Sequence, residues 1–420
     1  MKVCTLVLSF FFSHVSTETL YVALYNGNIS TLSLTNYADI TTSANNLAKN
    51  GYFAGSAPET KYELTQVSST KTTAQNPAWL TLNTQNNVLY LLDGTTTGNG
   101  TISSYRASPS GVTLLDSVEC LIDGAHAGFY LNGIRLAVAH YTSSALQTYE
   151  VTSNGNMTPL QRFTYTMSAP GPVASRQSAP HPHMAFADPT GQYIIVNDLG
   201  ADLVRVYAVN QTSGELSERE SLVAAPGSGP RHGVFSRSPI SVAGVNGTTQ
   251  YVYYLDAEIA GTVTAYGVNY LPDQGGLQFD LIKEYTTLAP GVAMPPIGKG
   301  ISGEIGLSRD GDFLVISNRR DASFNGTIQQ YPPNGTSDSI NTYRVRQDLG
   351  GVLDFVQTVP AGGATPRTYA MNAAENLVAV ALEFSDKITI LKRDRNTGMI
   401  LEQVAEINVS GDPWAILWDE

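Results

Sequence analysis

A short segment recurs along this chain, and its opening carries a charged or titratable side chain in most copies. Three copies begin at Pro180, Ser302 and Ala364 and read PHPHMAFADPTGQYIIVNDLG, SGEIGLSRDGDFLVISNRR and ATPRTYAMNAAENLVAVALEF. Across the copies, the reactive residues at the opening are His126, His183, Arg231, His232, Glu304 and Arg367. Those that end the second predicted strand are Tyr141, Asp198, Glu258, Arg319 and Glu383. If the copies surround one axis, these side chains would meet near one end of it.

An anion site is the first chemistry that these residue types suggest. A guanidinium held in a fixed frame binds a carboxylate or phosphate through two hydrogen bonds and stays charged at any relevant pH. Arg231, Arg319 and Arg367 would therefore bind an anion. His183 can accept or donate a proton near neutral pH. A partly buried Glu258 or Glu304 would be its partner in acid–base catalysis.

Each of these residues also has a purely structural interpretation. An arginine at a repeat opening can bridge neighbouring repeats through backbone carbonyls, which is the alternative for Arg367. His126 is interpreted either as a buried structural histidine or as a substrate contact. His181 and His183 share one face of a strand, which is compatible with zinc binding, but no third ligand follows at a recognisable spacing. We expect no metal and no cofactor.

The repeat predicts a ring of β-sheets. Its openings fall near Pro77, Ala125, Pro182, Pro230, Gly303, Pro366 and Pro413. The intervals are roughly 50 to 70 residues, at or above the roughly 40–50 residues of a propeller blade. A unit of this length cannot bury its apolar face alone, so the copies must stack. We predict an all-β, seven-bladed β-propeller of four-stranded blades, with an eight-bladed or irregular β fold as the alternative.

The two ends of the sequence predict how the ring closes. Asp412–Trp418 opens a unit, whereas Thr19–Leu34 reads as the second and third strands of a unit that lacks its first. Pairing the two would complete a seventh blade and remove exposed sheet edges. Residues 18–420 are therefore predicted to form a single domain. Leu271–Met294 and Tyr331–Asp348 are rich in Gly, Pro, Asn and Asp and are predicted to be loop-like insertions.

The first 17 residues are predicted to be a cleaved signal peptide. Lys2 precedes the apolar stretch Val3–Phe12, which is too short to span a bilayer, and small residues follow. A buried first strand is the alternative. Acceptor sequons for N-glycosylation fit a protein that is secreted, extracellular or in a cell wall; they begin at Asn28, Asn99, Asn156, Asn210, Asn246, Asn325, Asn334 and Asn408. Cys4 lies in the signal segment, which leaves Cys120 unpaired.

Composition excludes several classes of partner. The formal net charge of −12 disfavours nucleic acid, whose phosphates require a basic face, and an anionic membrane surface. No apolar run after the signal segment reaches membrane-spanning length. We expect a small-molecule partner, no nucleic acid and no membrane span, and we make no prediction of the oligomeric state.

Four stretches carry a resemblance to a known family. PHPHMAFADPTGQYIIVNDLGADLVRVY, GSGPRHGVFS, GEIGLSRDGDFLVISNRR and GGATPRTYAMNAAENLVAVAL resemble the lactonase family of seven-bladed propellers. That family includes bacterial-type 6-phosphogluconolactonases and fungal carboxy-cis,cis-muconate cyclases. The resemblance implies His183 and Glu258 in proton transfer and Arg231 and Arg319 as carboxylate clamps. Substrate contacts are then expected from Arg367, Glu304, His232, His126 and Tyr141.

The resemblance also implies an activity. We expect an enzyme that forms or hydrolyses a lactone on a small carboxylated anion, as a carboxymuconate cyclase does. A sugar-lactone hydrolase similar to 6-phosphogluconolactonase is one alternative, and a non-catalytic glycoprotein that uses the propeller as a binding platform is another. Two departures stand out: Thr368 replaces the histidine of a usual PRH, and Ala257 replaces the asparagine of a usual Asn-Glu. The familiar enzymes are largely intracellular, whereas this chain is predicted to be a secreted, fungal-like member.

Overall fold

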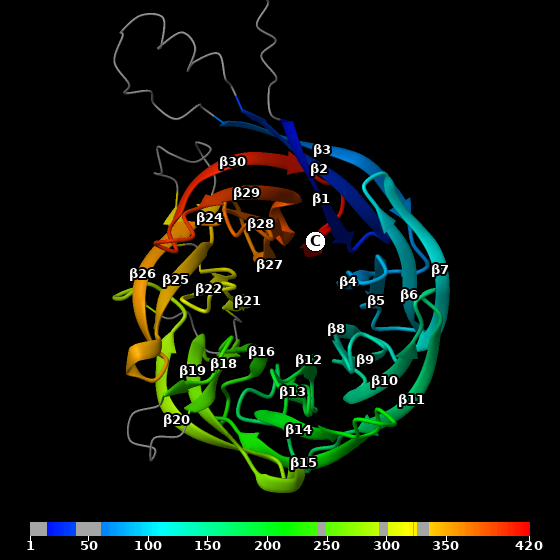
Figure 1. The fold of residues 1–420 in the computed structure, drawn as a ribbon, viewed down its shortest axis with the longest axis vertical. Helices are drawn as coiled ribbons and strands as arrows, with labels where there is room; N and C mark the ends of the chain where they lie inside the picture. Colours follow the sequence, from blue (N-terminus) through cyan, green and yellow to red (C-terminus); the bar gives the residue numbers. More distant parts are fainter. Residues whose placement is uncertain (1–14, 39–59, 242–248, 294–300, 322, 326–335) are drawn as a thin grey trace, which may run out of the picture.

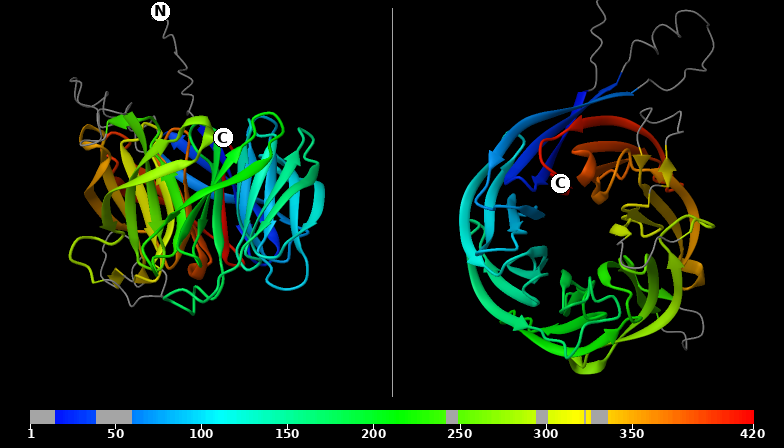
Figure 2. Two further views of the ribbon diagram at one scale, coloured as in Figure 1. Left: turned by 90° about the horizontal axis from the view of Figure 1, so that it is seen from below. Right: turned by 180° about the vertical axis from the view of Figure 1, so that it is seen from behind.

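Seven antiparallel sheets stand around a central channel in the computed structural model of the chain (Figure 1). The structure describes residues 15–38, 60–241, 249–293, 301–321, 323–325 and 336–420. The first strand of each blade lies beside the channel and the fourth lies at the rim, and Figure 2 shows the same ring from the side and from behind. The all-β, seven-bladed prediction is confirmed.

The seven blades share one strand order, which runs from the channel outward. Blades one to three are β4 (Pro77–Asn83), β5 (Val88–Asp93), β6 (Gly100–Ser108) and β7 (Gly111–Cys120); β8 (Gly124–Tyr130), β9 (Arg135–His140), β10 (Ala145–Val151) and β11 (Met157–Thr164); and β12 (Pro182–Ala187), β13 (Tyr193–Asp198), β14 (Leu203–Val209) and β15 (Leu216–Val223). Blades four and five are β16 (Pro230–Phe235), β18 (Thr249–Ala257), β19 (Thr262–Tyr270) and β20 (Leu277–Thr286); and β21 (Ser302–Leu307), β22 (Phe313–Asn318), β25 (Ser339–Arg346) and β26 (Val352–Pro360).

Blades six and seven complete the ring. They are β27 (Pro366–Met371), β28 (Leu377–Leu382), β29 (Lys387–Arg393) and β30 (Ile400–Asn408); and β31 (Pro413–Trp418), β1 (Val15–Leu24), β2 (Asn28–Ala38) and β3 (Thr60–Lys71). Short elements in the connections are β17 (Ile240–Ser241), β23 (Phe324–Asn325), β24 (Thr336–Ser337) and three 3-10 turns, η1 (Pro272–Gln274), η2 (Gln347–Leu349) and η3 (Glu383–Ser385).

The ring closes in blade seven as the sequence predicts. Strand β31 pairs antiparallel with β1, with Leu20 opposite Trp418 and Val22 opposite Ile416. The indole N–H of Trp418 donates to the carbonyl of Ala370 in blade six at 3.0 Å. The closing strand is therefore held by its pairing with β1 and by a side-chain bond to blade six.

Second strands supply the core, because they are apolar on both faces. All six residues of β5, β13, β22 and β28 are buried. Tyrosine hydroxyls then connect consecutive blades: Tyr130 donates to the carbonyl of Gly214 at 3.0 Å, Tyr254 to Gly351 at 2.7 Å, and Tyr369 to Val315 at 2.7 Å. Apolar packing and these bonds hold each blade against its neighbour, which fixes the inner strands around the channel.

Two predicted insertions are wrong. Leu271–Met294 contains β20, the outer strand of blade four, and Tyr331–Asp348 contains β25, the third strand of blade five. In the first segment, glycine and proline lie in the short connection that precedes β20. The composition of each whole segment therefore hides a regular strand.

The described residues include only some of those that the sequence links to export. Residues 1–14 lie outside the described residues, and Val15–Thr17 begin β1. Asn246 and Asn334 also lie outside them, Asn325 is in β23, Asn28 is half-buried, and the exposed sequon asparagines are Asn99, Asn156, Asn210 and Asn408. Cys120 is a free thiol. Among the described residues, no helix has the length and apolar character needed to cross a membrane.

Candidate functional site

A cavity of about 180 Å³ lies at the end of the channel where the inner strands begin. Its walls come from the first residues of these strands, from residues that follow the second strands, and from two connecting loops. Among its lining residues are seven that the sequence predicts: Tyr141, His183, Arg231, His232, Glu258, Arg319 and Arg367. We call this cavity the site pocket.

A β-bulge near the start of each inner strand explains why these side chains meet. Pairing skips one residue of the inner strand in five blades and two residues in blades four and five. The skipped residues are Ala78, Ala125, His183, Arg231–His232, Gly303–Glu304, Arg367 and Trp414. A bulge leaves its extra residue out of the ladder and re-aims the side chain. The opening of each sequence repeat therefore coincides with the β-bulge of an inner strand.

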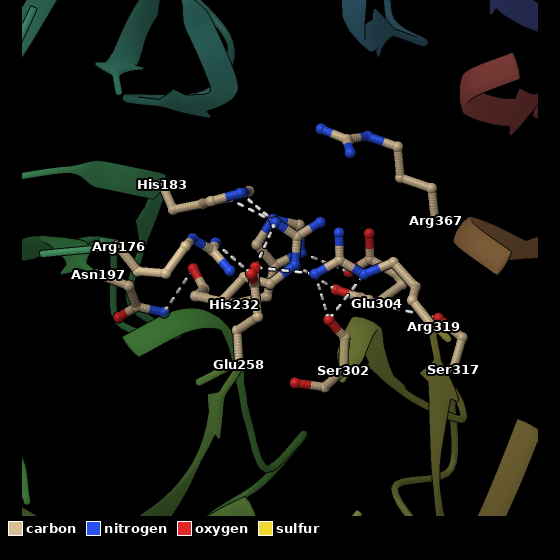
Figure 3. Close-up of polar contacts among 12 residues, drawn as sticks. Arg176, His183, Asn197, His232, Glu258, Ser302, Glu304, Ser317, Arg319 and Arg367 are labelled. Carbon is tan, nitrogen blue, oxygen red and sulfur yellow. Dashed lines mark hydrogen bonds and ion pairs between the residues drawn. The ribbon is translucent and has the colours of Figure 1, made fainter. Parts of the chain in front are cut away.

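The carboxylate of Glu258 is the centre of the charge cluster (Figure 3). Glu258 is 2% exposed, and its Oε2 lies 2.8 Å from Nη2 of Arg319 and 3.4 Å from Nη1 of Arg231. Its Oε1 accepts a hydrogen bond from Arg176. Burial alone would raise the pKa of Glu258, but the three guanidiniums outweigh burial and hold the pKa well below its usual range. Glu258 is therefore an anion that orients three arginines.

His183 contacts an arginine rather than a carboxylate. Nη1 of Arg231 donates to Nε2 of His183, and Nε of Arg231 donates to the carbonyl of Gly303 at 2.7 Å. Burial lowers the pKa of His183 well below its usual value, and the neighbouring Arg231 charge adds to the effect. Burial also lowers the pKa of Arg231, to about 9. His183 is thus a neutral imidazole at pH 7, with its Nε2 lone pair occupied.

Arg319 and Arg367 retain hydrogen-bonding capacity for a ligand. Nε and Nη2 of Arg319 donate to the carbonyl of Ser302 at 3.0 and 2.7 Å, and within the described part of the chain its Nη1 has no acceptor. The guanidinium carbon of Arg367 lies 3.6 Å from the centroid of the Trp414 ring, and Nη1 reaches Glu383 at 3.5 Å. Figure 3 shows Arg367 apart from Glu258 and Arg319, and all three line the site pocket.

A layer of aromatic rings closes the pocket toward the middle of the channel. Ring centroids of Trp79 and His126 are 4.3 Å apart, and His232 lies 5.7 Å from both. Nδ1 of His232 is 2.8 Å from Oε1 of Glu304. Beyond this layer lies a second cavity of about 600 Å³, bordered by Trp79, His126 and Glu304 and by the ends of the inner strands. We call it the far cavity.

Two predicted substrate contacts are therefore corrected. His126 and Glu304 line the far cavity and not the site pocket. Glu304 is the second residue of a two-residue bulge, and His126 follows the one-residue bulge at Ala125. Position in the bulge alone does not decide the layer, because His232 is also the second residue of a two-residue bulge and lines the site pocket.

The predicted histidine pair does not converge. The ring of His181 stacks on Tyr141 with centroids 4.3 Å apart, and its Nδ1 is 3.1 Å from the Tyr141 carbonyl, whereas His183 faces Arg231. Burial raises the pKa of the Tyr141 hydroxyl. Tyr141 therefore stays a neutral wall of the pocket, beside Arg176.

A family model matches most of the chain. The match covers residues 40–418, and the family is described as lactonase, 7-bladed beta-propeller. The chain belongs to this family. A protein named probable 6-phosphogluconolactonase from Arthroderma benhamiae is 27% identical over 361 residues, covering 86% of this chain and 84% of its own length. The 6-phosphogluconolactonase of Bacillus subtilis is 26% identical over 329 residues, covering 77% and 82%.

Solved structures share the fold of this lactonase-family chain. The periplasmic gluconolactonase of Pseudomonas aeruginosa superimposes with a TM-score of 0.72 at 23% identity, covering 96% of this chain and 99% of its own. At that identity the likeness shows the fold alone. It agrees with the seven blades that the strand pairing defines.

The sequence prediction misses four residues that line the site pocket: Trp79, Asp123, Arg176 and Trp414. Arg176 lies in the loop between β11 and β12, outside the repeat, so no periodic pattern marks it. Asp123 immediately precedes β8, and burial raises its pKa. Trp79 and Trp414 do stand at repeat openings. Trp414 occupies the same position in its copy of the repeat as Arg367 does in the preceding copy. A prediction based on titratable side chains omits these two tryptophans, although their positions in the repeat could have identified them.

Proposed function

We propose that this chain hydrolyses a sugar lactone in the site pocket. The observation that carries the proposal is that Arg319 and Arg367 both line the site pocket and keep donors after their protein contacts. Hydrolysis of a lactone passes through a tetrahedral intermediate with a negative oxygen, and fixed cationic donors stabilise that charge. The product is an open-chain acid, whose carboxylate matches the same guanidiniums.

The reaction needs water, a base and a stabilised oxyanion. In our proposal the lactone carbonyl oxygen approaches Nη1 of Arg319, while Arg367 holds an anionic or hydroxyl group of the substrate. Glu258 keeps Arg319 and Arg231 in place and balances part of their charge. Because Glu258 is itself engaged by three guanidiniums, we assign it to positioning rather than to proton transfer.

The names of relatives separate the two candidate substrates, a sugar lactone and a carboxymuconate lactone. The pocket would also accept the carboxylates of a carboxymuconate lactone, the substrate class that the sequence resemblance places first. The names of the relatives favour the sugar-lactone alternative, because two of them are called 6-phosphogluconolactonase or probable 6-phosphogluconolactonase. We therefore place cyclisation of carboxymuconate second.

A substrate panel tests this assignment. Glucono-1,5-lactone, its 6-phosphate and a carboxymuconolactone are incubated with the protein, and acid release is followed with a pH indicator. We expect a sugar lactone to open faster than in buffer and Arg367→Ala to raise KM about tenfold or more through loss of ground-state binding. Arg346→Ala is the matched control, since Arg346 pairs with Asp348 and Asp354 on the surface. Turnover of the carboxymuconolactone alone would overturn the sugar-lactone assignment.

We also propose that the chain is exported and glycosylated. Support comes from the apolar N-terminal segment and from exposed sequon asparagines at Asn99, Asn156, Asn210 and Asn408. Mass spectrometry of the protein from its native source should find a new N-terminus near residue 18 and glycopeptides at these positions. A retained Met1 with unmodified asparagines contradicts the proposal.

A further inference from the structure

His232 has the geometry of an oriented base at the floor of the site pocket. The side chain is 1% exposed and lines the pocket. Its Nδ1 lies 2.8 Å from Oε1 of Glu304, and within the described residues its Nε2 has no hydrogen-bond partner. The carboxylate of Glu304 also accepts the backbone N–H of Ile305 at 3.1 Å, which fixes it. A buried ring nitrogen without a partner is uncommon, because the lost hydrogen bond costs free energy.

We propose that His232 is the general base of the reaction and that Glu304 positions it. A carboxylate beside Nδ1 requires the proton on Nδ1, which leaves the lone pair on Nε2. This is the logic of a histidine held in one tautomer by an acid. Glu304 reaches the dyad from the far-cavity side of the layer, so only the imidazole enters the pocket. The inference rests on the proposed hydrolysis and adds to it the residue that activates water.

Two other candidate bases in the pocket, His183 and Glu258, are engaged by arginines. Nε2 of His183 accepts a hydrogen bond from Arg231, so a proton can reach it only if that bond breaks. Both oxygens of Glu258 face guanidiniums. Nε2 of His232, by contrast, is a buried ring nitrogen that has no hydrogen-bond partner among the described residues.

The surroundings of His232 keep the base in its neutral form. The titratable groups that face it are Glu304, Arg231, Arg319, His183 and His126. Burial lowers the pKa of His232, Glu304 opposes that effect, and Arg231 reinforces it. The lone pair is therefore available at pH 7 without prior loss of a proton.

The proposed step conserves atoms and charge. Nε2 of His232 takes a proton from water as the water oxygen bonds to the lactone carbonyl carbon, and the carbonyl electron pair moves to the oxygen held by Arg319. The carbonyl then re-forms as the bond from carbon to the ring oxygen breaks. The ring oxygen takes the proton from Nε2, which restores neutral His232. The products are one hydroxyl group and one carboxylic acid, which ionises to solvent.

Chemical rescue provides the test. His232→Ala should lower kcat for the best sugar lactone at least 100-fold, with KM changed less than threefold, because acid–base groups typically contribute 10²–10⁴-fold. Added imidazole, which fits the space left by the ring, should restore part of the rate. His140→Gln is the control: it alters another buried histidine, in β9 and outside the pocket, and should leave kcat unchanged.

A second variant covers the case in which His232→Ala does not fold. Glu304→Gln keeps an oxygen near Nδ1 but removes the charge that raises the pKa of His232. The acid limb of the kcat/KM profile should therefore move to lower pH, a shift that a structural role would not produce. Wild-type kcat in His232→Ala, or an unmoved limb in a folded Glu304→Gln, overturns the dyad. Absence of wild-type activity on every lactone overturns the proposed function instead.

Discussion

Glu258 shows how one buried anion can organise a site made from distant repeats. Its neighbours Arg176, Arg231 and Arg319 come from three different segments, and the two buried ones, Arg231 and Arg319, need its counter-charge to stay buried. Removing one partner of such a cluster leaves an uncompensated charge, which typically costs about 3–5 kcal/mol. The cluster therefore holds the arginines in position, and the remaining N–H donors of Arg319 and Arg367 are available to a substrate.

Asp256, two residues before Glu258, predicts a pH dependence of stability. It is completely buried, and burial raises its pKa to about 7. A raised carboxyl pKa means stability that is fully present below the unfolded pKa near 4 and is lost as the pH rises toward about 7. Asp256→Asn should therefore gain stability over the wild type by on the order of 2–3 kcal/mol between pH 5 and pH 8. Urea unfolding at the two pH values measures this, and an equal difference at both would contradict it.

The sequence identifies the residues of the site where these residues occupy equivalent positions in the repeat. The phase of the repeat selects His183, Arg231, Glu258 and Arg319, and they do converge on one pocket. The repeat groups Glu304 with the residues of the site pocket, whereas its side chain lines the far cavity. It misses Arg176, because a loop outside the repeat carries that residue. Orientation at a bulge depends on strand pairing, which a single sequence does not display.

Among the elements, the pairing of β1 with β31 is what turns a row of blades into a ring. It is predictable because each end of the chain lacks the strands that the other supplies. Outer strands are harder to recognise: β20 is largely exposed, so it lacks the apolar run that identifies second strands. Its flanking glycine and proline then make the segment resemble a loop.

Proline in the closing pair tests that role. Val22 lies in β1 between Ser30 of β2 and Ile416 of β31. Val22→Pro removes a backbone donor from a central strand and should destabilise the fold by about 3 kcal/mol or more. Val15→Pro is the control, because Val15 is half-exposed and pairs with Tyr37 at the end of β1 that extends beyond β31. Equal melting temperatures for the two variants would show that the closure does not limit stability.

For the whole molecule, the channel is divided by the aromatic layer into two unequal cavities. Substrate should therefore enter from the mouth of the site pocket only. Ala125→Trp places a large side chain in that pocket and should lower kcat/KM at least tenfold. Arg309→Trp places the same side chain at an exposed position of the far cavity and should leave kcat/KM unchanged. Loss of activity in Arg309→Trp alone would mean that the far cavity is the entrance.

The whole molecule is also acidic, with a formal net charge of −12, yet four arginines line its site pocket and three of them contact Glu258. This contrast favours small anions or developing negative charge at one place and disfavours polyanions elsewhere.

The most direct test of the proposed activity is the rate at which Arg319→Ala opens the best sugar lactone, measured beside the wild type and Arg346→Ala. Loss of an oxyanion donor should lower kcat about 100-fold or more, while Arg346→Ala keeps the wild-type rate. A folded Arg319→Ala with wild-type kcat would contradict the central claim that this pocket is where the lactone reacts.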